Sequence, residues 1–129
     1  MAEEVELTIP VQADLVVLAR LTAATVAARA DFDVEEIEDL RLAVNELCLS
    51  LVNGGGTGRL HLVFSRDDDL IEVSCRYHAG SPGVAAASDG SSEDLSSRIL
   101  DALVDEHGQA SGDGQARAWL RKRRMRQSD

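Results

Sequence analysis

The chain has 129 residues and a formal net charge of −10, and its residues are 44% hydrophobic but only 3% aromatic. This length allows one domain with its own core and is too short for two, and aliphatic side chains must supply that core. No run of 18 uncharged apolar residues occurs, so a membrane-spanning helix is not expected. The first ten residues lack a basic start and an apolar segment, so a secretory signal peptide is not expected either.

Charge is distributed unevenly along the chain. Residues 1–116 carry 22 acidic and 7 basic residues, whereas residues 117–129 carry six basic residues and one acidic residue. The acidic body argues against a nucleic-acid partner, which would need a basic face, and favours a basic protein partner, although solubility alone also explains it. The basic end, residues 120–129, is expected to continue a strand into a solvated tail; a nucleic-acid patch is the alternative.

Both cysteines, Cys48 and Cys75, fall within apolar patterns. This placement predicts reduced, buried thiols in a cytoplasmic protein, with a disulfide as the alternative. A zinc site is not expected, because Cys75 and His78 form only one weak pair of closely spaced ligands.

A strand and two helices are expected in the first part of the chain. Alternating apolar residues predict a strand over 5–11, and an Ala- and Leu-rich segment without Gly or Pro predicts a helix over 13–30. Asp33 is expected to cap a second helix, with Glu36 completing a capping box, and this helix should end at the glycines that follow Asn53. Its predicted buried stripe consists of Val34, Ile37, Leu40, Val44, Leu47, Cys48 and Leu51.

The second part of the chain predicts a hairpin, a loop, a helix and two further strands. The hairpin joins strands over 59–65 and 70–77, and a long polar, Gly-rich loop follows over 78–94. A short amphipathic helix is expected over 95–107. The last strand alternates over 115–123 and should pair with a short strand near 107–111.

This order of elements predicts an α+β fold in a single domain covering residues 1–129. Helices and strands that alternate in this way form a two-layer sandwich, with one mostly antiparallel mixed sheet and three helices on one of its faces.

Three segments carry a resemblance to a known family: "ARLTAA" at 19–24, "IEDLRLAVNELCLSLV" at 37–52 and "ILDALVDE" at 99–106. Together with the order of elements, they resemble the anti-sigma-factor serine kinases, a branch of the GHKL (Bergerat-fold, histidine-kinase-like) ATPases. The resemblance covers nearly the whole chain, and the helix around Glu46 is its most characteristic part. It implies a fold that holds Mg-ATP between the sheet and a lid.

The resemblance assigns roles to the polar face of the second helix. Glu46 stands at the position of the family's general base, and Ser50, one turn later, stands where the family has a Mg²⁺-binding Asn. By helical angle, Glu46, Ser50 and Asn53 share one face, opposite the predicted apolar stripe. A polar pocket face is therefore expected, with Ser50 as a weak metal ligand.

Other positions depart from the family's nucleotide motifs. Tyr77 stands where the family has an adenine-reading Asp, and Gly80 lies near the first glycine box. The second glycine box, expected just before the last helix, reads "EDLSSR" and places Ser96 and Ser97 near the phosphates, with an acidic residue at 94. Each lost charge-assisted hydrogen bond is worth roughly 1.5–3 kcal/mol. The pocket is therefore expected to be degenerate, with no ATP or Mg²⁺ bound, or only weakly.

The resemblance also implies partners. The expected function is that of an anti-sigma-factor-like regulator of transcription in a stress response, cytoplasmic and homodimeric, which sequesters a sigma factor and answers to an anti-anti-sigma factor. Arg20 matches an exposed, partner-binding arginine of the family. An enzyme is not favoured. The alternative is an active serine kinase that binds Mg-ATP, uses Glu46 as base and phosphorylates the anti-anti-sigma factor; a further one is a regulator whose partner is not a sigma factor.

Overall fold

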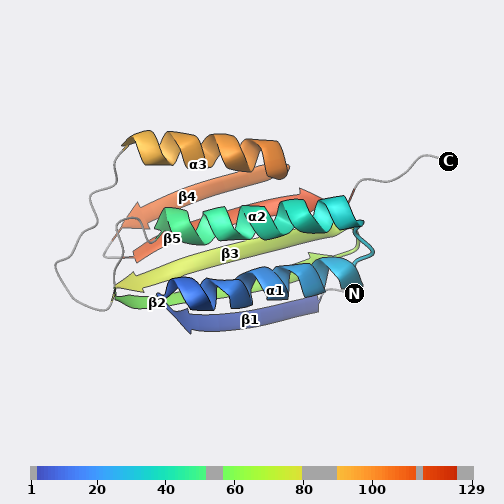
Figure 1. Cartoon of the computed structure of the whole chain (residues 1–129), viewed down its shortest axis with the longest axis horizontal. Coiled ribbons are helices and arrows are strands. Elements are labelled where there is room, and N and C mark those ends of the chain that lie inside the picture. Colours follow the sequence, from blue (N-terminus) through green and yellow to red (C-terminus); the bar gives the residue numbers. More distant parts are fainter. Residues whose placement is uncertain (1–2, 52–56, 80–89, 113–114, 125–129) are drawn as a thin grey trace.

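A computed structural model describes residues 3–51, 57–79, 90–112 and 115–124 of the chain. Within these ranges the chain forms one sheet and a layer of helices, in the order expected from the sequence (Figure 1). The elements are β1 (Glu3–Pro10), α1 (Ala13–Arg29), α2 (Val34–Leu51), β2 (Gly58–Asp67), β3 (Leu70–Ala79), α3 (Gly90–Leu103), β4 (Glu106–Gly112) and β5 (Gln115–Arg123).

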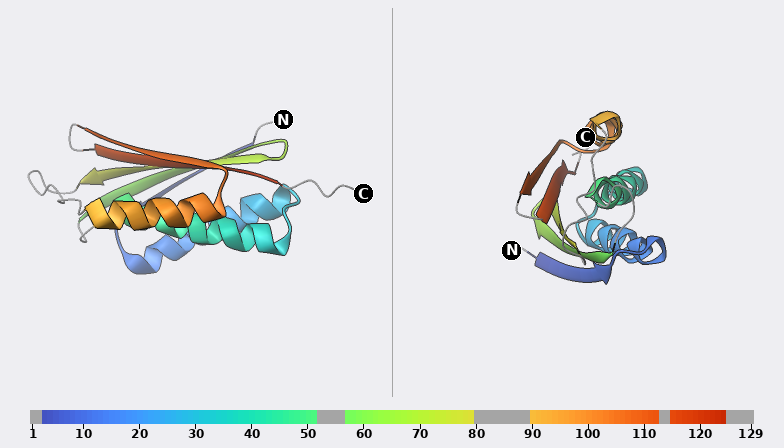
Figure 2. Two further views of the ribbon diagram at one scale, coloured as in Figure 1. Left: turned by 90° about the horizontal axis from the view of Figure 1, so that it is seen from above. Right: turned by 90° about the vertical axis from the view of Figure 1, so that its left-hand side faces the viewer.

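The sheet has the strand order β1-β2-β3-β5-β4, and every neighbouring pair is antiparallel. All three helices cover the same face of the sheet, and the opposite face, called the outer face below, carries no helix (Figure 2). The predicted α+β sandwich is confirmed, with a fully antiparallel sheet in place of a mixed one. No helix in the described ranges is long and apolar enough to cross a membrane.

The start of α2 follows the sequence prediction. The backbone N–H of Asp33 donates to Glu36 Oε1 at 3.0 Å, and the backbone N–H of Glu36 donates to Asp33 Oδ1 at 2.8 Å. These two bonds are the predicted capping box, which satisfies two N–H groups that a helix start leaves without partners. The predicted apolar stripe is wrong at Val34, which is 78% exposed, because the helix begins at this residue on the solvent side of its first turn.

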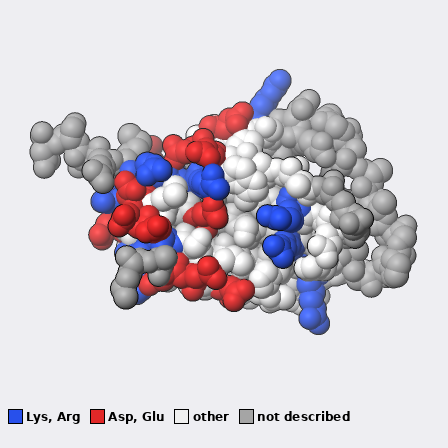
Figure 3. All heavy atoms as spheres, turned by 180° about the vertical axis from the view of Figure 1, so that it is seen from behind, with Lys and Arg blue, Asp and Glu red and all other residues white. Residues whose placement is uncertain are grey.

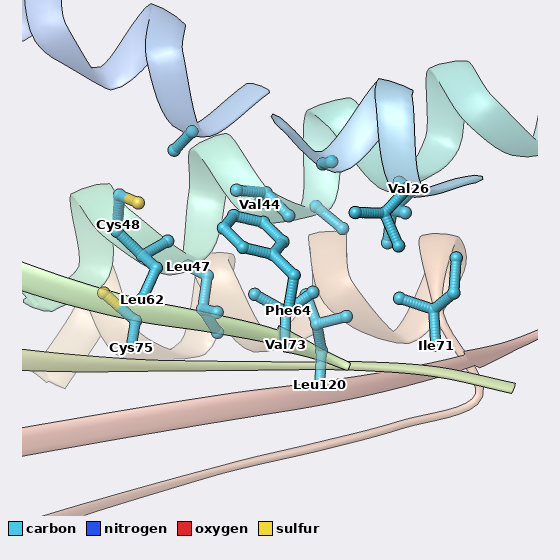
Figure 4. Packing of buried hydrophobic residues seen from close by; sticks show 14 of the residues in the cluster. Val26, Val44, Leu47, Cys48, Leu62, Phe64, Ile71, Val73, Cys75 and Leu120 are labelled. Carbon is cyan, nitrogen blue, oxygen red and sulfur yellow. The ribbon is translucent and has the colours of Figure 1, made fainter. Parts of the chain in front are cut away.

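The core lies between the helices and the inner face of the sheet and is mainly aliphatic, as expected (Figure 4). Phe64 is its largest fully buried side chain. Cys48 of α2 and Cys75 of β3 are both buried and free, which confirms the predicted reduced thiols. Contact with Cys48, together with burial, raises the pKa of the Cys75 thiol far above its usual range, so this thiol stays protonated.

The β2–β3 hairpin is confirmed, but its turn is shorter than the four charged residues, 66–69, that separate the two predicted strands. Asp67 pairs with Leu70, so only Asp68 and Asp69 form the loop. Asp68 has a φ of 56°, in the left-handed region that short polar residues tolerate. Ile71, Val73 and Cys75 of β3 are buried on one face, as the alternation predicts.

The predicted boundaries of the last helix are wrong at both ends, since α3 begins at Gly90 and ends at Leu103. Its first turn is entirely polar or glycine and therefore gives no apolar signal in the sequence. At the other end, the backbone N–H of Asp105 donates to the carbonyl of Arg121 in β5 at 3.0 Å. The chain therefore pairs with the sheet from residue 105 and cannot continue the helix to 107. Residues 93–98, predicted to precede the helix as a glycine box, lie within it.

Candidate functional site

The candidate site lies on the polar side of α2. Leu47 and Cys48 are fully buried against the sheet, which fixes the rotation of the helix about its axis. Glu46 and Ser50 are half-buried and point toward α3 and β4, as the two contacts below demonstrate. Figure 1 shows α2 between α1 and α3, with β4 beneath α3 at the edge of the sheet.

Glu46 is in direct contact with α3. The Ser96 hydroxyl donates to Glu46 Oε1 at 2.5 Å, and Ser96 is only 8% exposed. Hydrogen bonds from a hydroxyl to a carboxylate are short and roughly twice as strong as neutral ones. This bond joins residues 50 positions apart in the chain and holds α3 against the polar side of α2.

The Ser50 hydroxyl is used in two internal hydrogen bonds. It donates to the carbonyl of Leu47 at 2.8 Å and accepts from Gln109 Nε2 of β4 at 2.9 Å. A hydroxyl has one donor and two acceptor sites, so only one lone pair is left for another ligand. Within the described ranges, no group of three or more His, Cys, Asp or Glu side chains is placed to hold a metal ion.

Gln109 is a residue that the sequence analysis missed. It faces the helices because it lies on the same side of β4 as His107, whose ring is bonded to Asp101 of α3 at 2.6 Å. Strand alternation could have indicated its direction. Its partner Ser50 lies 59 positions away, and no short motif connects the two residues.

Tyr77 lies at the end of β3 that is nearest the site, on the inner face of the sheet. Its hydroxyl donates to the carbonyl of Thr57 at 2.9 Å. The side chain that replaces the expected adenine-reading Asp therefore uses its polar atom on the backbone. Ser97 is exposed on α3, next to the buried Ser96. Asn53 and Gly80, two other predicted site residues, lie outside the described residues.

Arg20 lies on α1 and is half-buried rather than exposed as predicted. Its Nε is buried and has no hydrogen-bond partner in the described part of the chain. A buried donor without a partner costs stability, so Arg20 has an N–H that a further acceptor could satisfy.

An open groove of about 540 Å³ lies between α1 and the edge strand β1. Its lining is mainly apolar, with Leu18 42% and Leu21 52% exposed. At its rim, Arg29 forms two hydrogen bonds with the carboxylate of Glu3, at 2.9 and 2.7 Å, and this contact lowers the pKa of Glu3. The lining residues are Glu3, Val5, Leu18, Leu21, Thr22, Thr25, Val26 and Arg29.

No family model matches the chain, but curated relatives do. The "Serine-protein kinase RsbW" of Bacillus cereus (strain AH187) is 35% identical over 74 residues, which are 55% of this chain and 46% of that protein. The protein of the same name from Bacillus mycoides (strain KBAB4) is 34% identical over 74 residues, with the same coverage. The chain is homologous to these serine-protein kinases. It spans about half of their length, and the similarity confirms the family resemblance that the motifs indicated.

The Glu46–Ser96 bond leads to a prediction about stability. Ser96→Ala removes the hydroxyl that the half-buried Glu46 carboxylate accepts from, so the free energy of unfolding should fall by about 1–2 kcal/mol. Ser97→Ala is the matched control, since Ser97 is the exposed neighbour on the same helix, and it should change stability by less than about 0.5 kcal/mol. Urea denaturation followed by circular dichroism measures both. Equal effects of the two substitutions would contradict the importance of this bond.

Proposed function

We propose that this protein is an anti-sigma-factor-like regulator that acts by binding a sigma factor, with a nucleotide pocket too altered to bind Mg-ATP tightly. The observation that carries the proposal is that Glu46 and Ser50, the two pocket residues of α2, are already bonded to Ser96 and Gln109. The class of regulator rests on the motif resemblance to the anti-sigma-factor serine kinases, and similarity to proteins named serine-protein kinase RsbW supports it.

The energetics of nucleotide binding support a binding role over catalysis. Mg-ATP bound at Glu46 and Ser50 would compete with their present hydrogen bonds to α3 and β4. A hydrogen bond to a charged group is worth roughly 1.5–3 kcal/mol, and micromolar binding corresponds to about −8 kcal/mol in total. Displacing one bond to the Glu46 carboxylate and the neutral bond of Ser50 would cost about 3 kcal/mol and weaken the affinity by roughly a hundredfold. The net charge of −10 adds repulsion against a triphosphate.

The net negative charge of the protein and the surface of α1 both support binding of a protein partner. An acidic body attracts a basic protein and accelerates their encounter. Arg20 is not among the residues that line the α1–β1 groove, so the helix has room for two separate contacts. In this proposal Arg20 contacts an acidic group of the sigma factor or of its competing anti-anti-sigma factor.

The proposal includes a cytoplasmic homodimer, in which the α1–β1 groove receives the same surface of a second copy. A symmetric dimer needs a self-complementary patch. The groove offers exposed leucines beside the free edge strand β1, and apolar residues exposed in a patch are typical of an interface.

One observation favours a second candidate function, an active serine kinase. Glu46 accepts a hydrogen bond from a serine hydroxyl at 2.5 Å, which is the contact that a general base makes with a serine substrate. In that case the substrate serine of an anti-anti-sigma factor would take the place of Ser96, and Mg-ATP would bind beside it. A regulator whose partner is not a sigma factor is the third possibility.

Titration with Mg-ATP separates the first two functions. Isothermal titration calorimetry should detect no binding in the micromolar range, because the pocket side chains are engaged internally. Radiolabelled ATP incubated with a candidate anti-anti-sigma factor should leave that protein unlabelled. Micromolar binding together with labelled serine would establish the kinase instead.

Charge reversal on α1 tests capture of the sigma factor. Arg20→Glu should weaken capture at least tenfold, because it replaces an attraction to an acidic group by a repulsion. Arg98→Glu is the matched control: it makes the same change of charge at an exposed position on α3. Affinities are measured by biolayer interferometry with candidate sigma factors. Capture that is equally strong with all three proteins would remove Arg20 from the interface, and absence of capture by the unmodified chain would favour a different partner.

A substitution in the groove tests the dimer. Leu21→Glu should shift the protein from dimer to monomer in sedimentation velocity, because it places a charge in the apolar groove. Leu42→Glu is the control, since Leu42 is 56% exposed on α2 and does not line the groove. A monomeric unmodified protein, or a dimer that survives Leu21→Glu, would refute this interface.

A further inference from the structure

Three arginines lie close together on the outer face of the sheet. The register of β3 and β5 places Arg76 directly opposite Arg117, and that of β2 and β3 places Arg59 opposite His78, two residues beyond Arg76. The residues that alternate with them, such as Cys75 and Ala118, are buried on the helical side, so the arginines point away from the helices. All three are exposed.

These arginines differ from Arg121 and Arg123, on the same face of the sheet, in having no counter-ion within the described ranges. Arg121 pairs with Glu72 at 2.6 Å and with Glu106 at 3.0 Å, and Arg123 pairs with Asp69. For Arg59, Arg76 and Arg117, no ion pair is formed with any residue in the ranges that the structure describes. The described part of the chain thus leaves them without an acidic partner, although the chain as a whole carries 23 acidic residues.

The direct Arg76–Arg117 pair has an energetic cost. Like charges that face each other across an antiparallel pair of strands destabilise the sheet. A like-charge pair that lowers stability, and that no nearby acidic group offsets, is a candidate for a functional site. Figure 3 views the outer face: basic side chains stand on a largely uncharged area at one end, whereas the other end mixes acidic and basic groups.

We propose that these three arginines, here named the outer arginine patch, bind a short acidic peptide segment of a partner protein. Side chains directly opposite on a sheet have Cβ atoms about 5 Å apart, so Arg76 and Arg117 can hold one carboxylate between them. The planar guanidinium fork matches a carboxylate in two hydrogen bonds. Arg59 lies one strand and two residues away, about 8 Å diagonally, within reach of a second acidic residue of an extended segment.

Nucleic acid is the less suitable occupant of the patch. Single-stranded nucleic acid needs free aromatic rings for its bases, and the nearby Trp119 ring has the guanidinium of Arg121 stacked 4.8 Å from its centre. The ring also lies against Gly108, where a Cβ would come within 2.8 Å of it. A long polyanion that followed β3 along the same face would meet Glu72, four residues from Arg76. A short acidic segment avoids that repulsion, which salt screens beyond about 10 Å at 0.1 M.

The outer arginine patch is separate from the candidate site on α2 and from the α1 surface, so the inference does not depend on the proposed function. The candidate site on α2 lies on the helical side of the sheet, and Arg20 belongs to a helix that covers that side (Figure 2). A partner held at the patch leaves both regions accessible.

The test uses the full chain, labelled with ¹⁵N, and a synthetic ten-residue peptide of alternating Glu and Ser. Amide signals of residues in β2, β3 and β5 beside the three arginines should shift as peptide is added at 50 mM salt. Fluorescence anisotropy of the labelled peptide gives the affinity. Arg76→Gln with Arg117→Gln should weaken binding at least tenfold, whereas Arg98→Gln, on α3, should leave it unchanged.

The same double substitution provides a check that is independent of the peptide. Because it removes a like-charge pair, the melting temperature of the Arg76→Gln, Arg117→Gln protein should stay the same or rise. A fall in the melting temperature would show that the arginines stabilise the sheet and would overturn the premise of the inference.

Three binding results would overturn the proposal. The first is an absence of amide shifts with the acidic peptide at 50 mM salt. The second is binding that the double substitution leaves unchanged. The third is tighter binding of a single-stranded oligonucleotide than of the peptide to the same residues, which would make the patch a nucleic-acid site.

Discussion

The packing of α2 on the middle of the sheet is the constraint on which the candidate site depends. Leu40, Val44, Leu47 and Cys48 are fully buried along one side of α2, and a helix held by such a stripe cannot rotate about its axis. Because residues four positions apart lie on one side of a helix, Glu46 and Ser50 must both face α3 and β4. The hydrophobic effect therefore positions the polar groups, and hydrogen bonds between side chains then determine which of them remain available to a ligand.

Much of the fold could be predicted from local signals, because those signals act over only a few residues. Asp33 and Glu36 lie three positions apart and form the capping box that their types indicate. The first residues of α3 carried no apolar pattern, so its start at Gly90 could not be found. The partners of the site were also beyond prediction. Ser96 meets Glu46, and Gln109 meets Ser50, only because distant elements pack together, and no spacing in the sequence encodes these contacts.

The two faces of the sheet differ in whether their polar and charged side chains have partners within the protein. On the helical side, the polar residues Glu46 and Ser50 of the candidate site are hydrogen-bonded to side chains of α3 and β4. On the outer face, Arg121 and Arg123 have acidic partners, while the outer arginine patch has none among the residues that the structure describes. Side chains on either face can be altered without changing the strands, so one fold can carry different functions.

The free edge of β1 has a consequence for how this protein can associate. An unpaired edge strand offers its backbone N–H and C=O groups to any other strand, which is a common start of aggregation. Here the edge carries Glu3, Glu4 and Glu6 and ends at Pro10, which has no N–H to donate. A second β1 added alongside would bring three more glutamates against the first three. The edge therefore resists extension of the sheet into a fibre. Association at this edge would have to use side-chain contacts and not backbone pairing of β1.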